Sequence, residues 1–345
     1  MPGVVGIISQ RSEHECEARV KAMIASMQHE AFYKSGAWSV SQSGIYAGWV
    51  GLENSASQIC SNEQKNITLI LSGECFLESG VASSQKLIQL YEQFGQRFIE
   101  RLNGLFSGLL VDQRQNLAFL FNDRYGSQRI YFHESDRDLY FASEAKALLR
   151  ILPELREFDP EGVVQFLALG CTLDWRTIFR DIHILPGGSL WTFENGGCRK
   201  EKYFLPETWE AQPQLSAADF ESRFQETFQK VLPRYFSTDS NTGIALTGGL
   251  DTRMIMACRP QNSGNQISYT FAGETGKTLD DKIAARVAAA CGLEHKLLRL
   301  KPDFFSNFAA HADKTIFATD GCFGISGTAK AETSASFIFS VWTKI

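Results

Sequence analysis

Residues 243–257 read GIALTGGLDTRMIMA, and this stretch restricts the fold more than any other part of the chain. An apolar strand runs directly into two adjacent glycines and then into an apolar helix, an order typical of parallel α/β sheets. Adjacent glycines allow a sharp turn and a close approach of the backbone to a ligand. The N–H groups of the turn and of the first helical turn lack intrahelical acceptors, so they form an anion site. The residues predicted to bind the anion are Thr247, Gly248, Gly249, Leu250, Asp251 and Thr252.

The side chains of this loop indicate which anion it binds. Thr247 and Thr252 supply hydroxyl donors for phosphate oxygens, whereas the carboxylate of Asp251 repels them. We therefore expect Asp251 to hold a Mg²⁺ ion that bridges the phosphate oxygens. The alternative is an ordinary strand-to-helix turn in which Thr252 or Asp251 caps the helix. A cap requires neither two glycines nor a second hydroxyl, which favours the phosphate site. The loop is not a Walker A loop, because Gly-Lys-[ST] is missing from its end.

The chain on both sides of this loop alternates helices and strands. Helices are predicted over 217–232, from 253 and over 280–291, and strands over 243–246, 267–271 and 295–300. This alternation predicts a parallel, doubly wound sheet. Three acidic residues, Glu274, Asp280 and Asp281, follow the second strand at the edge where such sheets bind ligands. For these three, a role in the site and a place in a solvated loop both stay open.

The first two hundred residues show a different order of predicted strands and helices. Strands follow one another at 105–111, 117–121, 129–132 and 139–142, while the clearest helical pattern, 84–94, stands apart from them. Strands in series with segregated helices predict a layered α+β domain. A Pro-containing stretch after residue 205 places the boundary between the two halves near residue 210.

Composition excludes several classes of protein. A net charge of -5 gives no electrostatic footprint for nucleic acid. No run of 18 apolar residues is present, so we expect a cytoplasmic protein without a membrane partner. The eight cysteines form no CxxC pair and have no histidine at zinc-ligand spacing, which argues against a structural metal. A sulfur-transferring tRNA enzyme ranks last for the same reasons.

Several short stretches carry a family resemblance by their order and spacing. They are Gly3–Gly6, Gly73-Glu74, Leu102-Asn103-Gly104, Asp123-Arg124-Tyr125-Gly126, Phe141–Leu149 and Leu185-Pro186-Gly187-Gly188, followed by the loop 247–252. Together they resemble the asparagine synthetase family up to about residue 327. The resemblance implies an α+β N-terminal nucleophile-type sandwich followed by a partial α/β parallel-sheet ATP pyrophosphatase domain. It also implies ATP and Mg²⁺ as cofactors, with Phe271 and Glu274 near the nucleotide.

The chemistry of the family's glutaminase domain is missing here. The family's nucleophile is a cysteine directly after the initiator methionine, and this chain has Pro2. The family's asparagine before Gly73 and Glu74 is Ser72, its arginine-bearing strand reads Ala47–Val50, and its acidic residue at the helix start is replaced around Ser83. The resemblance therefore implies an inactive glutaminase-like domain with a degenerate glutamine site at Ser72, Gly73 and Glu74, and it assigns no catalytic residue.

The sequence predicts three regions, and they leave two functions open. These regions are a glutaminase-like domain lacking its nucleophile (1–205), a partial ATP-binding synthetase domain (206–330) and an atypical tail (331–345). Family members normally continue well beyond this length, so we expect a C-terminally truncated relative. Similarity to β-lactam synthetase and the lasso-peptide cyclases favours ATP-dependent amide formation, by adenylation of a small-molecule or peptide carboxylate and attack by an amine or ammonia. The alternative is a truncated, non-catalytic nucleotide-binding remnant. The sequence leaves the identity of both substrates and the formation of an oligomer open.

Overall fold

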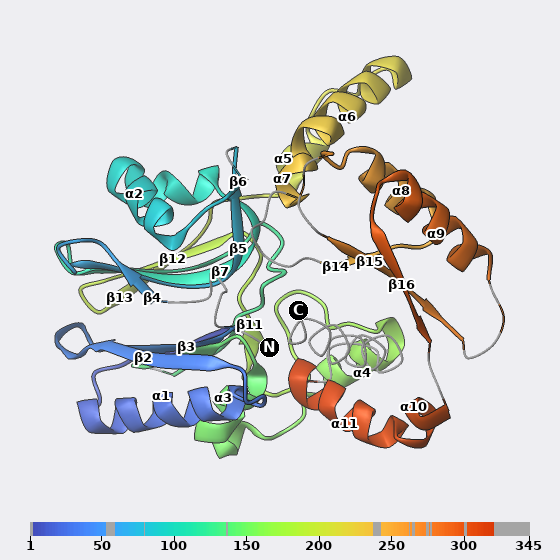
Figure 1. Ribbon diagram of the computed structural model, residues 1–345. Coiled ribbons are helices and arrows are strands. Elements are labelled where there is room, and N and C mark those ends of the chain that lie inside the picture. Colours follow the sequence, from blue (N-terminus) through green and yellow to red (C-terminus); the bar gives the residue numbers. More distant parts are fainter. Residues whose placement is uncertain are drawn as a thin grey trace. The chain divides into compact units, whose positions relative to one another are not determined.

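The computed structural model describes residues 3–52, 59–78, 80–135, 137–236, 243–261, 263, 266–273, 276, 278–299 and 302–320 (Figure 1). The chain forms two compact units. The first comprises Met1–Leu77 and Ala82–Ala211, and the second comprises Glu78–Val81 and Gln212–Ile345. The sequence-predicted tail 331–345, Pro2 and Glu274 lie outside the described residues.

Two antiparallel sheets form the centre of the first unit. In spatial order, the first sheet contains β11 (His183–Ile184), β9 (Tyr131–Glu134), β10 (Leu139–Ala142), β1 (Gly3–Ile8), β3 (Ile45–Gly51) and β2 (Lys34–Val40). The second contains β13 (Gly197–Lys202), β12 (Ser189–Glu194), β8 (Leu117–Asn122), β7 (Asn103–Asp112), β5 (Ile67–Leu77) and β4 (Ile59–Ser61). Apolar side chains of both sheets, including Val4, Ile45, Ile70, Leu109 and Phe141, meet in one buried cluster. The predicted α+β sandwich is therefore confirmed for this unit.

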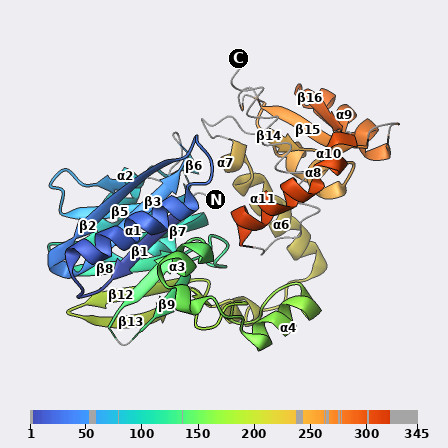
Figure 2. The same cartoon turned by 90° about the horizontal axis from the view of Figure 1, so that it is seen from below.

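Helices cover the outer faces of this sandwich. Helix α1 (Glu13–Met27) runs across the first sheet with α3 (Ala145–Ile151) beside it, as Figure 2 shows from below. On the second sheet, α2 (Ser84–Phe94) packs Leu87, Ile88 and Tyr91 into a second buried cluster. The remaining helical segments of the unit are α4 (Pro160–Leu169), α5 (Glu207–Glu210) and the 3₁₀ turns Ser41–Ser43, Gly95–Arg101 and Pro153–Leu155.

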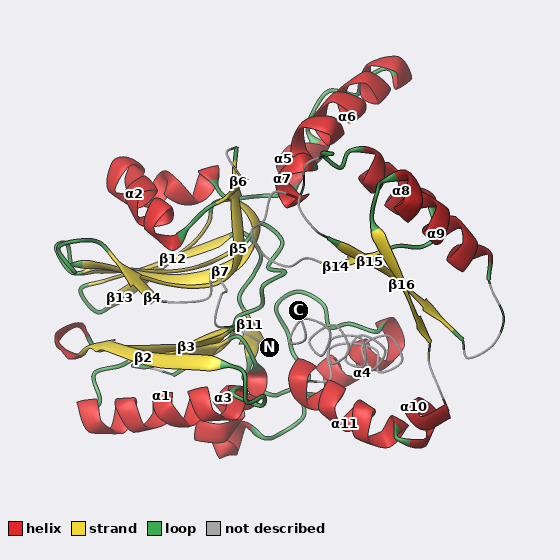
Figure 3. Ribbon diagram, viewed as in Figure 1, coloured by secondary structure: helices red, strands yellow, loops and turns green. Residues whose placement is uncertain are grey.

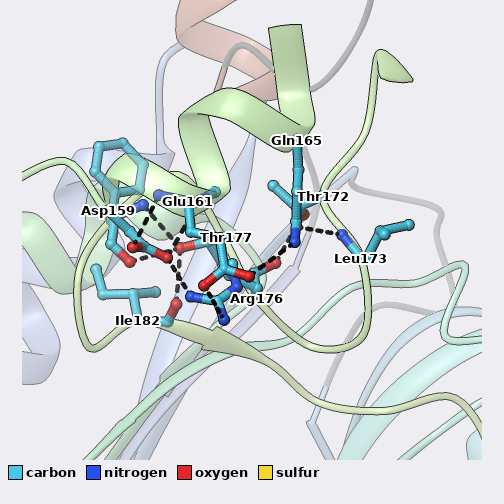
Figure 4. Close-up of polar contacts among 10 residues, drawn as sticks. Asp159, Glu161, Gln165, Thr172, Leu173, Arg176, Thr177 and Ile182 are labelled. Atoms are coloured by element: carbon cyan, nitrogen blue, oxygen red, sulfur yellow. Dashed lines mark hydrogen bonds and ion pairs between the residues drawn. The ribbon is translucent and has the colours of Figure 1, made fainter. Parts of the chain in front are cut away.

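A polar network, drawn in Figure 4, fixes helix α4. The carboxylate of Asp159 caps its N-terminus and forms an ion pair with Arg176 at 2.6 Å. Arg176 also pairs with Glu161 at 2.9 Å, and Gln165 accepts a hydrogen bond from the Leu173 backbone at 2.9 Å. The network holds a helix on which several apolar side chains are exposed, among them Leu167 at 79%.

The second unit contains a small parallel sheet. Its strands lie in the order β14 (Gly243–Ala245), β15 (Ile267–Ala272) and β16 (Glu294–Arg299), and both neighbouring pairs are parallel. The connections are α8 (Leu250–Ala257) and α9 (Leu279–Ala290), shown in red beside the yellow strands in Figure 3. The other elements of the unit are β6 (Gly80–Val81), α6 (Ala217–Val231), α7 (Pro233–Phe236), α10 (Pro302–Ser306) and α11 (Phe308–Thr319).

Only part of the predicted α/β arrangement is visible in this sheet. Met256 of α8 and Ala284 and Ala288 of α9 join Leu246 in a single apolar cluster, so both helices pack on one face. A doubly wound sheet has helices on both faces, because its strand order reverses direction. The three described strands lie side by side in the same order as in the sequence, so their spatial order does not reverse. The parallel sheet is thus observed, whereas the doubly wound arrangement is not seen in the described residues.

Candidate functional site

The loop at 247–252 lies at the carboxyl end of strand β14 and is anchored at its start. The N–H of Leu246 donates to the carbonyl of Tyr269 at 2.8 Å, and Thr270 Oγ1 donates to the carbonyl of Leu246 at 2.7 Å. Leu246 is 1% exposed, so the chain leaves the buried sheet at a fixed point. The loop then opens to solvent, because Thr247, Gly249 and Leu250 are exposed.

The two threonine hydroxyls close the loop on itself. Thr247 Oγ1 lies 3.1 Å from Thr252 Oγ1, and it accepts a hydrogen bond from the N–H of Gly249 at 3.1 Å. Thr252 Oγ1 also reaches the carbonyl of Gly249 at 3.2 Å. Both hydroxyls therefore shape the turn, a role that the sequence did not predict. Their expected role as donors to phosphate stays a prediction.

Helix α8 begins at Leu250, one residue after the second glycine. Its N-cap is Gly249, and no side chain caps the helix. The cap interpretation for Thr252 or Asp251 is therefore wrong. The N–H groups of Leu250, Asp251 and Thr252 donate to no described residue, as expected for the uncapped first turn of a helix. These three donors and the positive end of the helix dipole are the features that attract an anion.

The acidic residues near the loop have separate positions. Asp251 is exposed in the first turn of α8, and its carboxylate forms no hydrogen bond or ion pair with the rest of the described chain. Asp280 Oδ1 accepts a hydrogen bond from the N–H of Gly248 at 3.0 Å. Asp281 instead forms a capping box with Thr278 at the start of α9, and these hydrogen bonds lower the pKa of its carboxyl. Of the residues left open by the sequence, Asp280 is thus brought to the loop and Asp281 is structural.

Phe271 lies on the strand next to β14, and within the described residues it forms no ring contact with the loop 247–252. It is half-buried near the carboxyl end of β15, pairs in register with Leu298, and stacks edge-to-face on Tyr269 at 5.7 Å. The segment after β15 is held by Arg299, which donates to the carbonyls of Gly273 at 2.7 Å and Gly276 at 3.2 Å. The assignment of Phe271 to the nucleotide site stays a prediction.

No metal ion was predicted to bind to protein side chains alone. Across the residues that the structure describes, no group of three or more His, Cys, Asp and Glu side chains is arranged to hold a metal. Mg²⁺ usually takes one or two protein carboxylates and completes its shell with phosphates and water. The carboxylate of Asp251, which has no partner among the described residues, fits the single protein ligand of that pattern.

The residues of the degenerate glutamine site, Ser72, Gly73 and Glu74, lie on one strand of the first unit, β5. Ser72 is buried and faces Ser107 across the β5–β7 pair, whereas Glu74 is exposed. Between them Gly73 has a φ of +90°, and an added Cβ would lie 2.0 Å from the Leu105 carbonyl oxygen. Glycine is therefore the only residue that fits this backbone conformation and spacing without strain.

The side chains that the family resemblance implies for a glutamine site differ at these positions. Ala47, Gly48, Trp49 and Val50 of β3 carry no charge, and Ser83 caps α2 by accepting from the N–H of Lys86 at 3.2 Å. Cys75 lies next to Glu74, but burial raises the pKa of its thiol, which disfavours the nucleophilic thiolate.

The other motifs of the first unit contact one another. Asn122 Nδ2 donates to the carbonyls of Leu185 and Pro186 at 3.0 Å, and its Oδ1 accepts from the N–H of Ser189. The carboxylate of Asp123 accepts three backbone N–H bonds, from Tyr125, Ser127 and Gln128. These hydrogen bonds hold the loops that follow Asn122 and Leu185 in place.

Comparison with known proteins agrees with these observations. Residues 1–204 match the family model described as "Glutamine amidotransferase domain". The chain is 25% identical to the asparagine synthetase (glutamine-hydrolyzing) of Zea mays, over 68% of this chain and 38% of the maize protein. It is 24% identical to asparagine synthetase (glutamine-hydrolyzing) 3 of Bacillus subtilis (strain 168), over 51% of this chain and 28% of that protein. The chain thus spans little more than a third of the maize relative.

The similarity to the maize protein reaches past the first unit's domain. A share of 68% of 345 residues is about 235 residues, which exceeds the 204 residues of the domain match. Among solved structures, glutamine phosphoribosylpyrophosphate amidotransferase of B. subtilis is 12% identical with a TM-score of 0.39, over 86% of this chain and 65% of that chain. A likeness at this TM-score adds nothing to the assignment.

In the described part of the chain, no helix is both long enough and apolar enough to cross a membrane. The domain match covers residues 1–204, which is more than half of the chain. The chain therefore belongs to the glutamine amidotransferase domain family, as an asparagine synthetase-like member.

Proposed function

We propose that this protein binds Mg·ATP at the loop 247–252 and uses it to form an amide bond, while its first domain no longer hydrolyses glutamine. The carboxylate substrate is a small molecule or a peptide. We favour an amine carried by the substrate as the nucleophile, ahead of free ammonia. The chain's relation to asparagine synthetases supports this reaction class.

One observation carries the proposal. Three N–H groups at the start of α8 have no acceptor in the described chain, and in the loop before it the N–H of Gly249 donates to Thr247 Oγ1 while that of Gly248 donates to a carboxylate oxygen. This oxygen, Asp280 Oδ1, stands where a phosphate oxygen is expected. A loop that binds one anionic oxygen and leaves adjacent donors free has the chemistry of a polyphosphate site.

The residues of the loop suit the departure of pyrophosphate. A substrate carboxylate oxygen attacks the α-phosphorus of ATP, the bond to the β-phosphate bridging oxygen breaks, and pyrophosphate leaves with an acyl-adenylate remaining. The amine then attacks the acyl carbon and releases AMP. The N–H groups of Leu250, Asp251 and Thr252, which have no acceptor in the described chain, stabilise the negative charge that develops on the pyrophosphate. Asp251 would hold a bound Mg²⁺, and that ion would neutralise part of the same charge.

The first test concerns ATP. Mg·ATP at a concentration of one hundred times its dissociation constant is expected to raise the melting temperature of the second unit, because binding stabilises it by about 2.7 kcal/mol. For a unit of this size that is a shift on the order of 5–10 °C. Mg·AMP, which lacks the β- and γ-phosphates, is the matched control and is expected to produce little shift. Equal shifts with AMP and ATP would contradict a pyrophosphate site at this loop.

Turnover separates the two functions that the sequence left open. Release of AMP and pyrophosphate from ATP in the presence of added carboxylates and amines supports amide formation. A shift in melting temperature without any release supports the alternative, a nucleotide-binding protein without catalysis.

A second test concerns glutamine. Purified protein is expected to release no more glutamate from glutamine than a boiled control, because residue 2 is proline and Cys75 is buried. Glutamate is measured by coupled oxidation with glutamate dehydrogenase, with an active glutaminase as the positive control. Glutamate release that a thiol alkylator abolishes would overturn this part of the proposal.

A further inference from the structure

The carboxylate of Asp280 contacts the loop 247–252, although Asp280 lies in a different part of the sequence. Asp280 lies in the first turn of α9, 32 residues after Gly248, and its Oδ1 accepts the Gly248 N–H at 3.0 Å. An added Cβ at Gly248 would lie 2.5 Å from this oxygen. The glycine at 248 is therefore what allows the carboxylate to approach the backbone.

Helix capping does not explain this contact. The capping box at the start of α9 is complete with Thr278 and Asp281: Thr278 Oγ1 accepts from the Asp281 N–H at 3.2 Å, and Asp281 Oδ2 accepts from the Thr278 N–H at 2.9 Å. Asp280 points instead across to the neighbouring loop. Its side chain forms no other hydrogen bond and no ion pair within the described residues.

We propose that Asp280 competes with the phosphate chain of a nucleotide for the Gly248 N–H, so that it lowers the affinity of the loop for polyphosphate and must move away when polyphosphate binds. This inference rests on the proposed function of the loop. One N–H cannot donate a full hydrogen bond to two anionic oxygens. A carboxylate and a phosphate that both lie within hydrogen-bond distance of the same N–H also repel each other. A divalent cation that screens the phosphate charge lessens the repulsion, so the competition is strongest without Mg²⁺.

The experiment uses inorganic pyrophosphate as the probe, with and without Mg²⁺, in isothermal titration calorimetry of the full chain. Asp280→Ala is expected to bind metal-free pyrophosphate about tenfold more tightly than the unaltered protein, which corresponds to about 1.4 kcal/mol. Asp280→Asn removes the charge but keeps an acceptor oxygen, so its gain is expected to be smaller. Glu226→Ala, which removes an exposed charge from α6, controls for the change in net charge and is expected to bind as the unaltered protein does.

The outcomes separate this inference from the function on which it rests. If the unaltered protein binds Mg·ATP but Asp280→Ala binds pyrophosphate equally well or more weakly, the competition is wrong and the nucleotide site stands. Weaker Mg·ATP binding in both Asp280 variants would show that the carboxylate is a metal ligand, which also overturns the competition. If neither the unaltered protein nor any variant binds ATP or pyrophosphate, the proposed function fails and this inference with it.

Discussion

Asp251→Ala is expected to abolish the stabilisation of the second unit by Mg·ATP. Removing the carboxylate proposed to hold Mg²⁺ should weaken Mg·ATP binding about a hundredfold. At a nucleotide concentration that is one hundred times the original dissociation constant, the stabilisation then falls from about 2.7 to about 0.4 kcal/mol. Differential scanning calorimetry with and without Mg·ATP measures this loss directly.

The control for this variant is its behaviour without nucleotide. Asp251 is exposed and Gly249 is the N-cap of α8, so Asp251→Ala should lose only the helix-dipole term of about 0.3–1 kcal/mol. Asp303→Ala removes an exposed acidic residue from the first turn of α10 and is the matched variant. It should leave the response to Mg·ATP unchanged. A full response in Asp251→Ala would remove Asp251 from the site.

Gly73→Ala is expected to destabilise the first unit by about 4 kcal/mol. Gly73 has a φ of +90°, which an alanine adopts only with strain, and its new Cβ would lie 2.0 Å from the Leu105 carbonyl oxygen. Relief of that clash requires β5 and β7 to move apart, and this would disturb the pairing that extends along β5 from Ile67 to Phe76. Urea unfolding followed by tryptophan fluorescence and circular dichroism measures the change.

Gly95→Ala isolates the effect of the clash. Gly95 also has a positive φ, +57°, but nothing lies within 4 Å of an added Cβ there. Its replacement should cost about 1–3 kcal/mol, the penalty for a side chain at a φ of 57° and a ψ of -144°, without the added cost of a clash. Equal losses for the two variants would mean that the strands accommodate a side chain at residue 73 and that the glycine is not required there.

The sequence was sufficient to predict the loop and the elements around it. The apolar run before Thr247 and the pair Gly248-Gly249 identify a strand, a turn and a helix, because each pattern depends only on neighbouring residues. The structure places the same elements within a few residues of the predicted ones, and it adds that the helix begins at Leu250.

The contact of Asp280 with the loop could not be predicted in this way. Asp280 and Asp281 are adjacent, equally acidic and equally close to the start of a predicted helix. Only the three-dimensional structure assigns Asp281 to the capping box and Asp280 to Gly248, 32 residues away. The available signal was topological: adjacent parallel strands bring their carboxyl ends, and the helix starts that follow, to one edge of the sheet.

Strand β13 shows a different limit of sequence reasoning. Residues 197–202 read GCRKEK, and all six are exposed, so no alternation of apolar and polar residues indicates a strand. The segment is extended because its backbone pairs with β12, from Ser189 opposite Lys202 to Glu194 opposite Gly197. Its conformation is imposed by the neighbouring strand rather than by its own composition.

The position of β13 at the border of its sheet has a consequence for association. An outermost strand offers unpaired backbone groups on which another chain can extend the sheet. Here that strand carries Arg199, Lys200, Glu201 and Lys202, with Lys200 paired to Glu134 at 2.5 Å. A strand added from a second molecule would lie against these charged side chains and would partly desolvate them. The first unit is thereby protected along this border against the edge-to-edge stacking that leads to fibrils.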